Sequence, residues 1–449
     1  MSLRSLTQAF LKPASAMPAF DPTNFVSGVN NPHYPLLPGT TYINASPDGL
    51  VTDDLAVTRK TIEILGVTCV VVDDRVYEDG ELVERTLDYF AQDKQGNVWY
   101  FGEDSSHFED GKLVSTEGTW RAGNGDQHAG IIMLASPQVG DFYKQEQAPG
   151  VAEDQAVVTG LNAAVDVPYG SFSGLLQTDD STPLEPGFVE RKLYAEGIGL
   201  LQEAPNDGPQ IDLLRIRFDG TSKADTINGF TGKDEVNGGA GNDHLNGGIG
   251  ADVVKGGRGD DVLGGGNDTD ADILYGNQGR DQLYLRTGDK GYGGDANDKI
   301  WLADNTGFGL VDGGAQNGND VGRFRGDILQ FEGNLDLTKA GISEKITHIE
   351  TLSMMGSGHD HATLSAQDVL DIGDGRLDPS FFCGKDKFGA GDAVRVEGGD
   401  GDKLTLTGGN WHEVEDVRNV PDNYDIFARQ TPMGTAYVVV NEDVQVQLT

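Results

Sequence analysis

An aspartate recurs every nine residues in the middle of this 449-residue chain. The series is Asp225, Asp234, Asp243, Asp252 and Asp261, and an apolar residue follows each of them two positions later. Glycine pairs and a third glycine share the spacing, so each row reads G-G-x-G-x-D-x-U-x, where U is apolar. One such row cannot bury a core, whereas stacked rows can. The pattern therefore predicts a parallel β-roll.

The residue types within a row indicate a cation. Glycines permit the left-handed and tight backbone angles of the turn and bring carbonyl oxygens close enough to bind a hard ion. The aspartate supplies a charged oxygen. Without an ion, the carboxylates of successive rows would repel one another, and the small core could not offset that repulsion and the chain entropy. We therefore expect ion binding and folding to be coupled.

The register is interrupted once and then resumes. Two extra residues within Asn267–Asp270 shift it, and we expect a protruding loop there before Asp272 and Asp281 continue the series. A last row ends at Asp298, with Ala296 in place of the third glycine. A disordered Gly/Asp-rich linker is the alternative, but a linker would not keep an apolar residue in phase.

These rows resemble the RTX repeats of hemolysin-type calcium-binding proteins, which type I secretion systems export. The resemblance implies several Ca²⁺ ions held by turn aspartates and glycine carbonyls, an extracellular location, an export signal near the C-terminus, and the type I secretion machinery as a partner. The residues that we assign to calcium on this basis are Asp234, Asp243, Asp252, Asp261, Asp272, Asp281, Asp298, Gly239, Gly241, Gly248, Gly250, Gly257 and Gly259.

Charge and hydropathy exclude several classes. The 72 acidic residues outnumber 33 Lys and Arg, and the net charge of -39 disfavours nucleic acid and anionic membranes as partners. No apolar run approaches the roughly 20 residues of a membrane-spanning helix. The first residues lack the apolar core of a Sec signal. Cys69 and Cys383 are far apart, so we expect buried thiols and no disulfide framework.

The chain as a whole is predicted to be mostly β. We expect a flexible leader over 1–24, an antiparallel β-rich domain over 25–205, the β-roll over 206–325 and a β-rich region with the export signal over 326–449. Asp79-Gly80 and Asp110-Gly111 are typical of hairpin turns. Ser365 is expected to cap a short helix, with Asp368 completing a capping box.

The N-terminal domain leaves two functions open. The segment over about 31–203 is similar to an uncharacterised family of bacterial secreted or lipid-anchored domains, which supplies no mechanism. We favour a binding or adhesion module for an extracellular ligand or cell-surface partner over an enzyme. A secreted calcium-dependent hydrolase is the alternative, and it would gain from His107 or His128 beside Glu103, Asp104 or Glu153. The aromatic residues of these strands are expected in the core: Trp99, Tyr100, Phe101, Trp120 and Tyr143.

Two motifs near the C-terminus are weighed and set aside as metal sites. His359-Asp-His361 could bind a transition metal, but its composition favours an exposed turn. Gly398-Gly-Asp-Gly-Asp402 mimics a repeat turn, yet Lys403 stands at the ligand position. The surrounding segments look like those that follow the repeats of large secreted adhesins.

Overall fold

The computed structural model describes residues 19–315, 326–354, 356, 359–373, 376–377, 391–414 and 423–449. Cys383 and the first 18 residues of the predicted leader lie outside these ranges. The chain divides into two compact units, one ending at Phe218 but also holding Phe230–Lys233, the other formed by Asp219–Gly229 and Asp234–Thr449.

Strands dominate both units, which confirms the mostly β prediction. In the described residues the helical elements are η2 (Pro22–Asn24), η3 (Ser343–Lys345) and α1 (Ala366–Ile372). None of the described helices is both long and apolar enough to cross a membrane.

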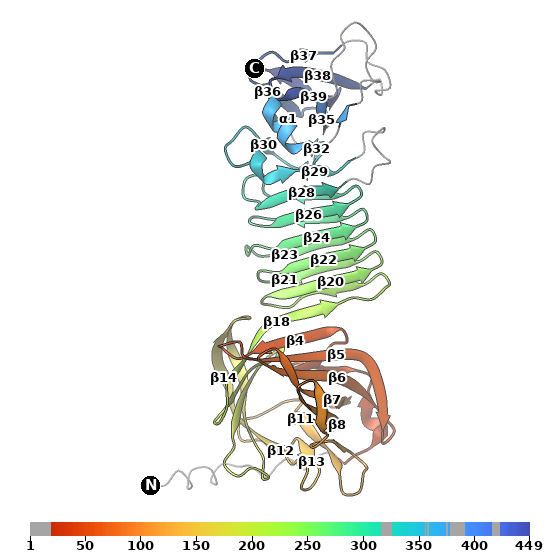
Figure 1. Cartoon of the computed structure of the whole chain (residues 1–449), viewed down its shortest axis with the longest axis vertical. Helices are drawn as coiled ribbons and strands as arrows, with labels where there is room; N and C mark the ends of the chain where they lie inside the picture. The colour runs from red at the N-terminus through yellow and green to blue at the C-terminus, as the bar shows by residue number, and fades with distance from the viewer. Residues whose placement is uncertain are drawn as a thin grey trace, which may run out of the picture. The chain divides into compact units, whose positions relative to one another are not determined.

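The first unit is an antiparallel meander built from long hairpins (Figure 1). The turn between β6 (Val67–Glu78) and β7 (Glu81–Asp93) is Asp79-Gly80, with φ of 52° and 83°, as the sequence predicts. β18 (Ile211–Asp219), the last strand of the meander, pairs antiparallel with β4 (Thr40–Ala45), which lies near the start of the meander in sequence. The remaining strands of this unit are β1 (Phe25–Val26), β2 (Val29–Asn31), β3 (Tyr34–Leu36), β5 (Val51–Ile64), β8 (Val98–Glu109), β9 (Lys112–Ser115), β10 (Trp120–Arg121), β11 (His128–Met133), β12 (Phe142–Lys144), β13 (Glu146–Gln147), β14 (Gln155–Val167), β15 (Gly170–Ser181), β16 (Glu190–Ala195) and β17 (Gly199–Pro205).

The aromatic residues expected in the core of the first unit are buried there. Phe101 and Trp120 are 0% and 1% exposed, and Trp99, Tyr100 and Tyr143 are also buried. Rings pack edge to face, with the centroids of Tyr100 and Trp120 5.4 Å apart. Such pairs add to the free energy gained by burying their area.

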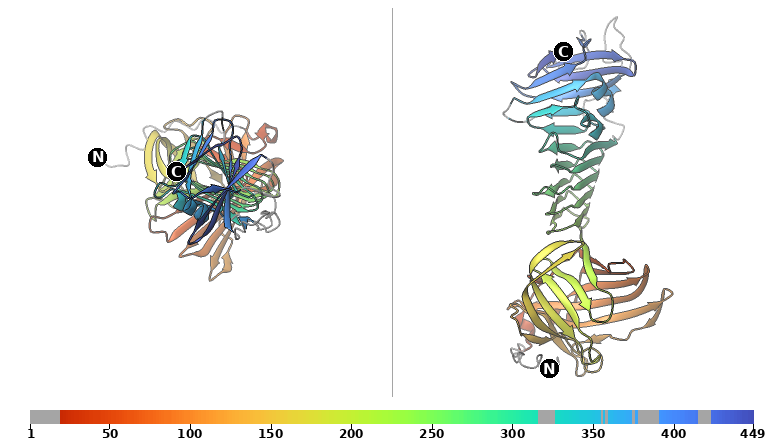
Figure 2. Two further views of the ribbon diagram at one scale, coloured as in Figure 1. Left: turned by 90° about the horizontal axis from the view of Figure 1, so that it is seen from above. Right: turned by 90° about the vertical axis from the view of Figure 1, so that its left-hand side faces the viewer.

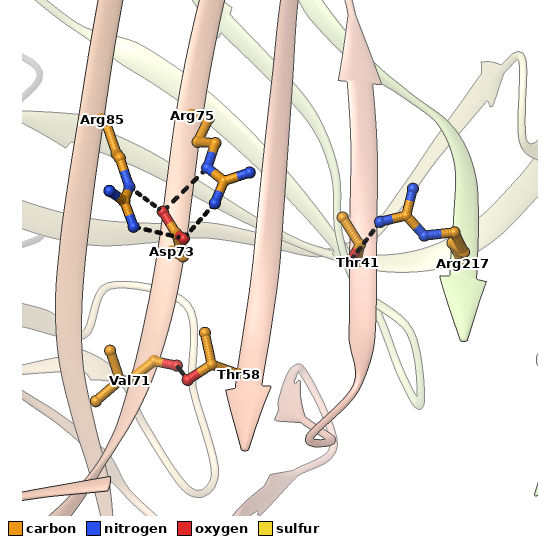
Figure 3. A network of polar contacts seen from close by, with 7 residues as sticks. All are labelled: Thr41, Thr58, Val71, Asp73, Arg75, Arg85 and Arg217. Carbon is orange, nitrogen blue, oxygen red and sulfur yellow. Dashed lines mark hydrogen bonds and ion pairs between the residues drawn. The ribbon is translucent and has the colours of Figure 1, made fainter. Parts of the chain in front are cut away.

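Charged side chains join β6 to β7 (Figure 3). Arg75 and Arg85 stand directly opposite each other, and both guanidinium groups donate two hydrogen bonds to the carboxylate of Asp73. Burial works against the ionised form, but the two guanidinium groups hold the pKa of Asp73 below its usual value. The carboxylate thus offsets the repulsion between the two arginines.

Parallel strands alternate between two sheets in the second unit (Figures 1 and 2). One sheet runs β20 (Asp234–Ala240), β22 (Val253–Arg258), β24 (Ile273–Gln278), β26 (Lys290–Asp295), β28 (Leu310–Ala315) and β31 (Ile346–Thr347). The other runs β19 (Thr226–Asn228), β21 (His244–Gly248), β23 (Val262–Gly266), β25 (Gln282–Leu285), β27 (Lys299–Leu302), β29 (Ile328–Phe331), β32 (Thr351–Met354) and β35 (Gly391–Glu397). Successive rows therefore contribute strands to the two sheets alternately.

The apolar residue of each row points between the two sheets. Val236, Val254 and Leu263 are 0% exposed, and Leu245 is 2% exposed. Ile227 of the first row is only half-buried. The buried set is thin, with one apolar side chain from each short row, so the core depends on stacking.

The C-terminal part of the second unit adds a third parallel sheet and the helix. That sheet runs β30 (Asn334–Asp336), β33 (His361–Ser365), β36 (Lys403–Thr407) and β40 (Gln445–Leu448). Ser365 and Asp368 form the predicted capping box at the start of α1. The remaining strands are β34 (Arg376–Leu377), β37 (His412–Glu413), β38 (Tyr424–Thr431) and β39 (Gly434–Asn441), and β39 extends the sheet of β35.

Candidate metal centre

Aspartates of the second unit form two hydrogen-bonded ladders along the edges of the stacked rows. In each step the backbone N–H of one aspartate donates to a carboxylate oxygen of the acidic residue one full turn of the roll later, over 2.7 to 2.9 Å. The first ladder is Asp225, Asp243, Asp261, Asp281, Asp298, Asp327 and Glu350. The second is Asp234, Asp252, Asp272 and Asp289.

The other carboxylate oxygen of most ladder residues has no hydrogen-bond partner although it is buried. These oxygens are Oδ2 of Asp243, Asp252, Asp261, Asp281, Asp298 and Asp327. A buried anionic oxygen without a partner costs several kcal/mol unless a cation or a proton compensates it. Each of these ladder steps thus has one buried carboxylate oxygen without a hydrogen-bond partner, which we call the open oxygen.

A glycine stands where each open oxygen meets a carbonyl of the following turn. A Cβ atom built on Gly256 would lie 2.4 Å from Oδ2 of Asp261 and 2.7 Å from the carbonyl oxygen of Gly276. On Gly247 it would lie 2.6 Å from Oδ2 of Asp252 and 2.4 Å from the carbonyl oxygen of Gly265. Two oxygen donors therefore converge on a space that any side chain would fill.

Burial raises the pKa of the ladder carboxyls, and neighbouring aspartates add to the rise while the ladder hydrogen bonds oppose it. The pKa is about 6 for Asp261, about 7 for Asp272, Asp281 and Asp298, and about 8 for Asp252 and Asp327. At neutral pH these groups hold protons part of the time. A cation in the turn would displace those protons.

The seven aspartates assigned to calcium from sequence all occupy ladder positions. The predicted glycines line the turns: a Cβ on Gly257 would lie 2.3 Å from the carbonyl oxygen of Gly239, and one on Gly259 would lie 1.7 Å from that of Gly241. Gly248 and Gly250 have the same left-handed φ, 119° and 125°. The turns consequently have no room for a side chain.

The structure adds acidic residues that the nine-residue register does not include. Asp289 and Asp327 accept ladder hydrogen bonds from Asp272 and Asp298. The sequence holds a signal for Asp327, because Asp327-Ile-Leu329 repeats the D-x-U half of a row. Asp225 and Asp289 differ from the others, since Oδ2 of Asp225 accepts from the N–H and hydroxyl of Thr221 and Oδ2 of Asp289 accepts from the N–H of Arg286.

Carboxylate and carbonyl oxygens are the donors that Ca²⁺ prefers. No group of three or more His, Cys, Asp or Glu side chains gathers around one point in the described residues. The residues present fit an ion held by one or two carboxylates together with glycine carbonyls.

A family model described as the RTX calcium-binding nonapeptide repeat matches the chain over 217–245, 237–271 and 268–289. Residues 217–289 of this chain are therefore RTX repeats. RTX repeats are calcium-binding motifs, so the match supports Ca²⁺ as the ion that this chain binds. No curated protein matches the chain. A solved structure of a putative lipoprotein from Parabacteroides distasonis covers 41% of this chain and 97% of its own, at 10% identity and a TM-score of 0.23.

A second group of carboxyls lies outside the RTX rows, in the first unit. The hydroxyl of Tyr100 lies 2.6 Å from Oδ1 of Asp88 and 2.7 Å from Oε2 of Glu103, which face each other across β7 and β8. A hydroxyl carries one proton, so one of the two carboxyls must be protonated to satisfy both contacts. Burial raises the pKa of Asp88 to about 8 and that of Glu103 to about 7.

Other buried charges surround this pair. The ammonium group of Lys192 lies 3.1 Å from Oε2 of Glu190 and 2.8 Å from Oε1 of Glu203. Burial and the charges of Asp154 and Glu103 raise the pKa of Glu146 to about 8. Sequence reasoning missed this cluster, because its members come from strands far apart in the chain.

Of the histidines considered for acid-base work, His107 is close enough to Glu103 for its charge to oppose the rise in the pKa of that carboxyl, but it makes its contacts with other residues. Nδ1 of His107 is 3.8 Å from Oε2 of Glu84, and its Nε2 is 3.1 Å from the carbonyl oxygen of Glu117. Asp104 instead pairs with Arg121 at 2.8 Å, and Glu153 accepts from the N–H of Gly150 in an exposed turn. His128 is exposed at the start of β11, in register with Gln147 of β13. Cys69 is fully buried, and burial raises the pKa of its thiol to about 12, so it is a core residue.

Proposed function

We propose that this chain is an extracellular protein whose RTX roll folds when Ca²⁺ binds. The folded roll presents the N-terminal unit, which acts as a binding or adhesion module. The unpartnered Oδ2 atoms of the ladder aspartates are the observation that supports it. In the cytoplasm, where free Ca²⁺ is scarce, these negative oxygens would face one another uncompensated. Outside the cell the ions would neutralise them, and the thin apolar core would then suffice.

Hydrogen exchange of the full chain tests the coupling between binding and folding. With a chelator, we expect the amides of 234–302 to exchange rapidly, and with millimolar Ca²⁺ to be protected, while 40–205 stays protected in both. Asp252→Asn and Asp261→Asn should raise the Ca²⁺ concentration needed for protection. Asp270→Asn, an exposed aspartate in the loop between rows, is the matched control. Equal protection of the roll with and without Ca²⁺ would contradict the proposal.

The assignment of calcium ligands extends the sequence-based set. We assign the ions to the ladder aspartates Asp234, Asp243, Asp252, Asp261, Asp272, Asp281 and Asp298, together with Asp327, and to glycine carbonyls of the same turns. Counting bound Ca²⁺ per chain in single Asp→Asn variants tests each member. A variant that retains the full number of ions with unchanged affinity removes its residue from the set.

Export through a type I secretion system, directed by the region 326–449, is part of the same proposal. In a host that carries such an exporter and no other route, the full chain should reach the medium. Removing 423–449 should retain it in the cells, while a folded cytoplasmic reporter stays inside in both cases. Secretion of the shortened chain at the same level would count against the export role of this region.

The binding role of the first unit is supported by a pair of partly exposed arginines on an otherwise acidic chain. Arg75 and Arg85 are 42% and 43% exposed around the single carboxylate of Asp73. Two guanidinium groups with one counter-charge suit an anionic group such as a sulfated or carboxylated surface glycan. We expect retention on an immobilised sulfated polysaccharide at low salt, which Arg75→Gln with Arg85→Gln should abolish. Arg191→Gln, on an exposed ion pair with Asp179, is the control.

Hydrolysis in the first unit is the second candidate, and one observation favours it. Asp88 and Glu103 share the hydroxyl of Tyr100, and burial raises their pKa values to about 8 and about 7, close to the neutral range in which a general acid or base works best. Chromogenic esters, glycosides and phosphoesters should reveal turnover that Glu103→Gln abolishes and that His128→Gln leaves intact. Turnover that survives Glu103→Gln would contradict this candidate.

A further inference from the structure

The third parallel sheet of the second unit repeats the ladder geometry outside the matched RTX rows. The N–H of Gly333 donates to Oδ1 of Asp360 over 2.6 Å, and the N–H of Asp360 donates to Oδ1 of Asp402 over 2.9 Å. Each of these residues directly precedes a strand, β30, β33 and β36. Asp243 and Asp261 stand in the same relation to β21 and β23.

The backbone contacts on the far side of each turn agree as well. The N–H of Lys403 donates to the carbonyl oxygen of Asp360 over 2.9 Å, as that of Val262 donates to Asp243 over 2.8 Å. Asp402, not Lys403, therefore occupies the ladder position, because this turn is one residue shorter than an RTX row. The sequence-based reason for excluding this turn as a metal site was that Lys403 stands at the ligand position, and that reason does not hold.

Asp360 carries an open oxygen of the kind found in the RTX ladders. Its side chain is 5% exposed, and Oδ2 is buried without a hydrogen-bond partner. Asp402 is different, since its Oδ2 accepts from the N–H of Gly399 over 2.7 Å. The unsatisfied charge is thus confined to Asp360.

A second carboxylate lies near the open oxygen. A Cβ built on Gly356 would lie 3.6 Å from Oδ2 of Asp360 and 3.7 Å from Oε1 of Glu332, so both acids face the same side of this glycine. Glu332 is exposed and can move toward an ion. The imidazole of His361 is engaged with the hydroxyl of Thr405 at 2.8 Å, which leaves oxygen donors at this place.

We propose that Asp360 and Glu332 hold a further Ca²⁺ ion, beyond the RTX rows, which ties the third sheet of the C-terminal region to the calcium-loaded state. Two carboxylates suit a hard divalent ion better than a transition metal. The inference rests on the proposed function in one respect, that ladder turns with an open Oδ2 bind calcium. The ion would make the order of β30, β33 and β36 depend on extracellular calcium.

Counting Ca²⁺ ions in the full chain tests this site. Asp360→Asn keeps the Oδ1 acceptor for Gly333 but removes the charge, and we expect it to bind one ion fewer than wild type. At saturating Ca²⁺ the amides of 361–365 and 403–407 should exchange faster, while those of 234–285 stay unchanged. Asp443→Asn, an exposed aspartate of the same unit, is the matched control and should bind the wild-type number.

Glu332→Gln decides the matter if Asp360→Asn fails to fold, because Glu332 is exposed and its side chain is not needed for packing. We expect this variant to lose the same ion or to bind it about tenfold more weakly. Wild-type ion number and affinity in both folded variants, or in Glu332→Gln alone, would overturn the site. A wild-type chain that binds no Ca²⁺ at all would instead refute the proposed function.

Discussion

The N–H of Asp252 donates to Oδ1 of Asp272 over 2.9 Å, although 20 residues separate them where the preceding step of the ladder spans 18. The extra residues form the loop at 267–270 and leave the ladder unchanged. Register in space is therefore set by the stacking of parallel strands, whose partners Val254 and Leu274 remain paired. The length of the turn between them is free to vary.

Calcium affinity should fall as the pH falls from 8 to 6. The ladder carboxyls have pKa values raised by burial, from about 6 for Asp261 to about 8 for Asp252, so protons compete with the ion in this range. Binding at pH 7 should release protons. Calorimetry in two buffers of different ionisation enthalpy measures that release. Identical heats in both buffers would show that the carboxyls are already ionised.

Without calcium, the folded roll should become less stable as the pH rises. A carboxyl whose pKa is raised on folding favours the folded state fully only below its unfolded value near 4, and this stability is lost as the pH rises through the folded value. For Asp252 and Asp327 that value is about 8. In chelator we therefore expect the amides of 234–302 to be better protected at pH 5 than at pH 8. The reverse order would contradict the assignment of raised pKa values.

Gly256→Ala should abolish binding at one turn. Its Cβ would lie 2.4 Å from Oδ2 of Asp261 and 2.7 Å from the carbonyl oxygen of Gly276, in the space assigned to the ion. We expect the loss of at least one Ca²⁺ per chain by ion counting. Gly264→Ala is the matched control, since nothing lies within 4 Å of a Cβ there. Equal loss in both variants would indicate a backbone effect.

Asp73→Asn should destabilise the first unit by about 1–2 kcal/mol, because two partly exposed ion pairs are lost and Arg75 and Arg85 are left facing each other. The loss should shrink at 1 M salt. Urea unfolding of the calcium-loaded chain measures it. Asp179→Asn removes a single exposed pair with Arg191 and should cost less than about 0.5 kcal/mol.

The repeat could be predicted from sequence because each row carries its full instruction locally. Glycines, an aspartate and one apolar residue at fixed spacing specify turn, ion and core together. Asp289 escaped because no glycine pair precedes it in its row. Asp327 escaped because a long insertion separates it from its glycine pair, Gly313-Gly314, although a Cβ on Gly313 would lie 2.7 Å from its Oδ2. Asp402 escaped for a related reason, since a turn shortened by one residue moves the aspartate out of the counted position.

The N-terminal cluster could not be predicted in the same way. Asp88 and Glu103 face each other only because β7 and β8 pair in a particular register, with an irregularity between Asp88 and Phe90. The Asp93–Asn97 turn joins the two strands, but the irregularity lies inside the hairpin, where no turn residue marks it. The hairpin turn at Asp110-Gly111, by contrast, depends on its own two residues and was predictable.

Tyr100→Phe should destabilise the first unit above pH 7 and have little effect at pH 5. The hydroxyl of Tyr100 donates its one proton to an ionised carboxylate of the pair Asp88 and Glu103, whose pKa values burial raises to about 8 and about 7. Below about pH 6 both carboxyls are protonated, so the loss of the Tyr100 hydroxyl should change the free energy of unfolding little. At pH 8 the loss of the hydroxyl should lower the free energy of unfolding by about 1.5–3 kcal/mol. Urea unfolding at pH 5.5 and pH 8 measures the difference. Tyr89→Phe is the control, because the hydroxyl of Tyr89 binds Asp104, which is 48% exposed and paired with Arg121. The loss of stability caused by Tyr89→Phe should be the same at both pH values. If the loss caused by Tyr100→Phe is also independent of pH, Asp88 and Glu103 do not titrate in this range.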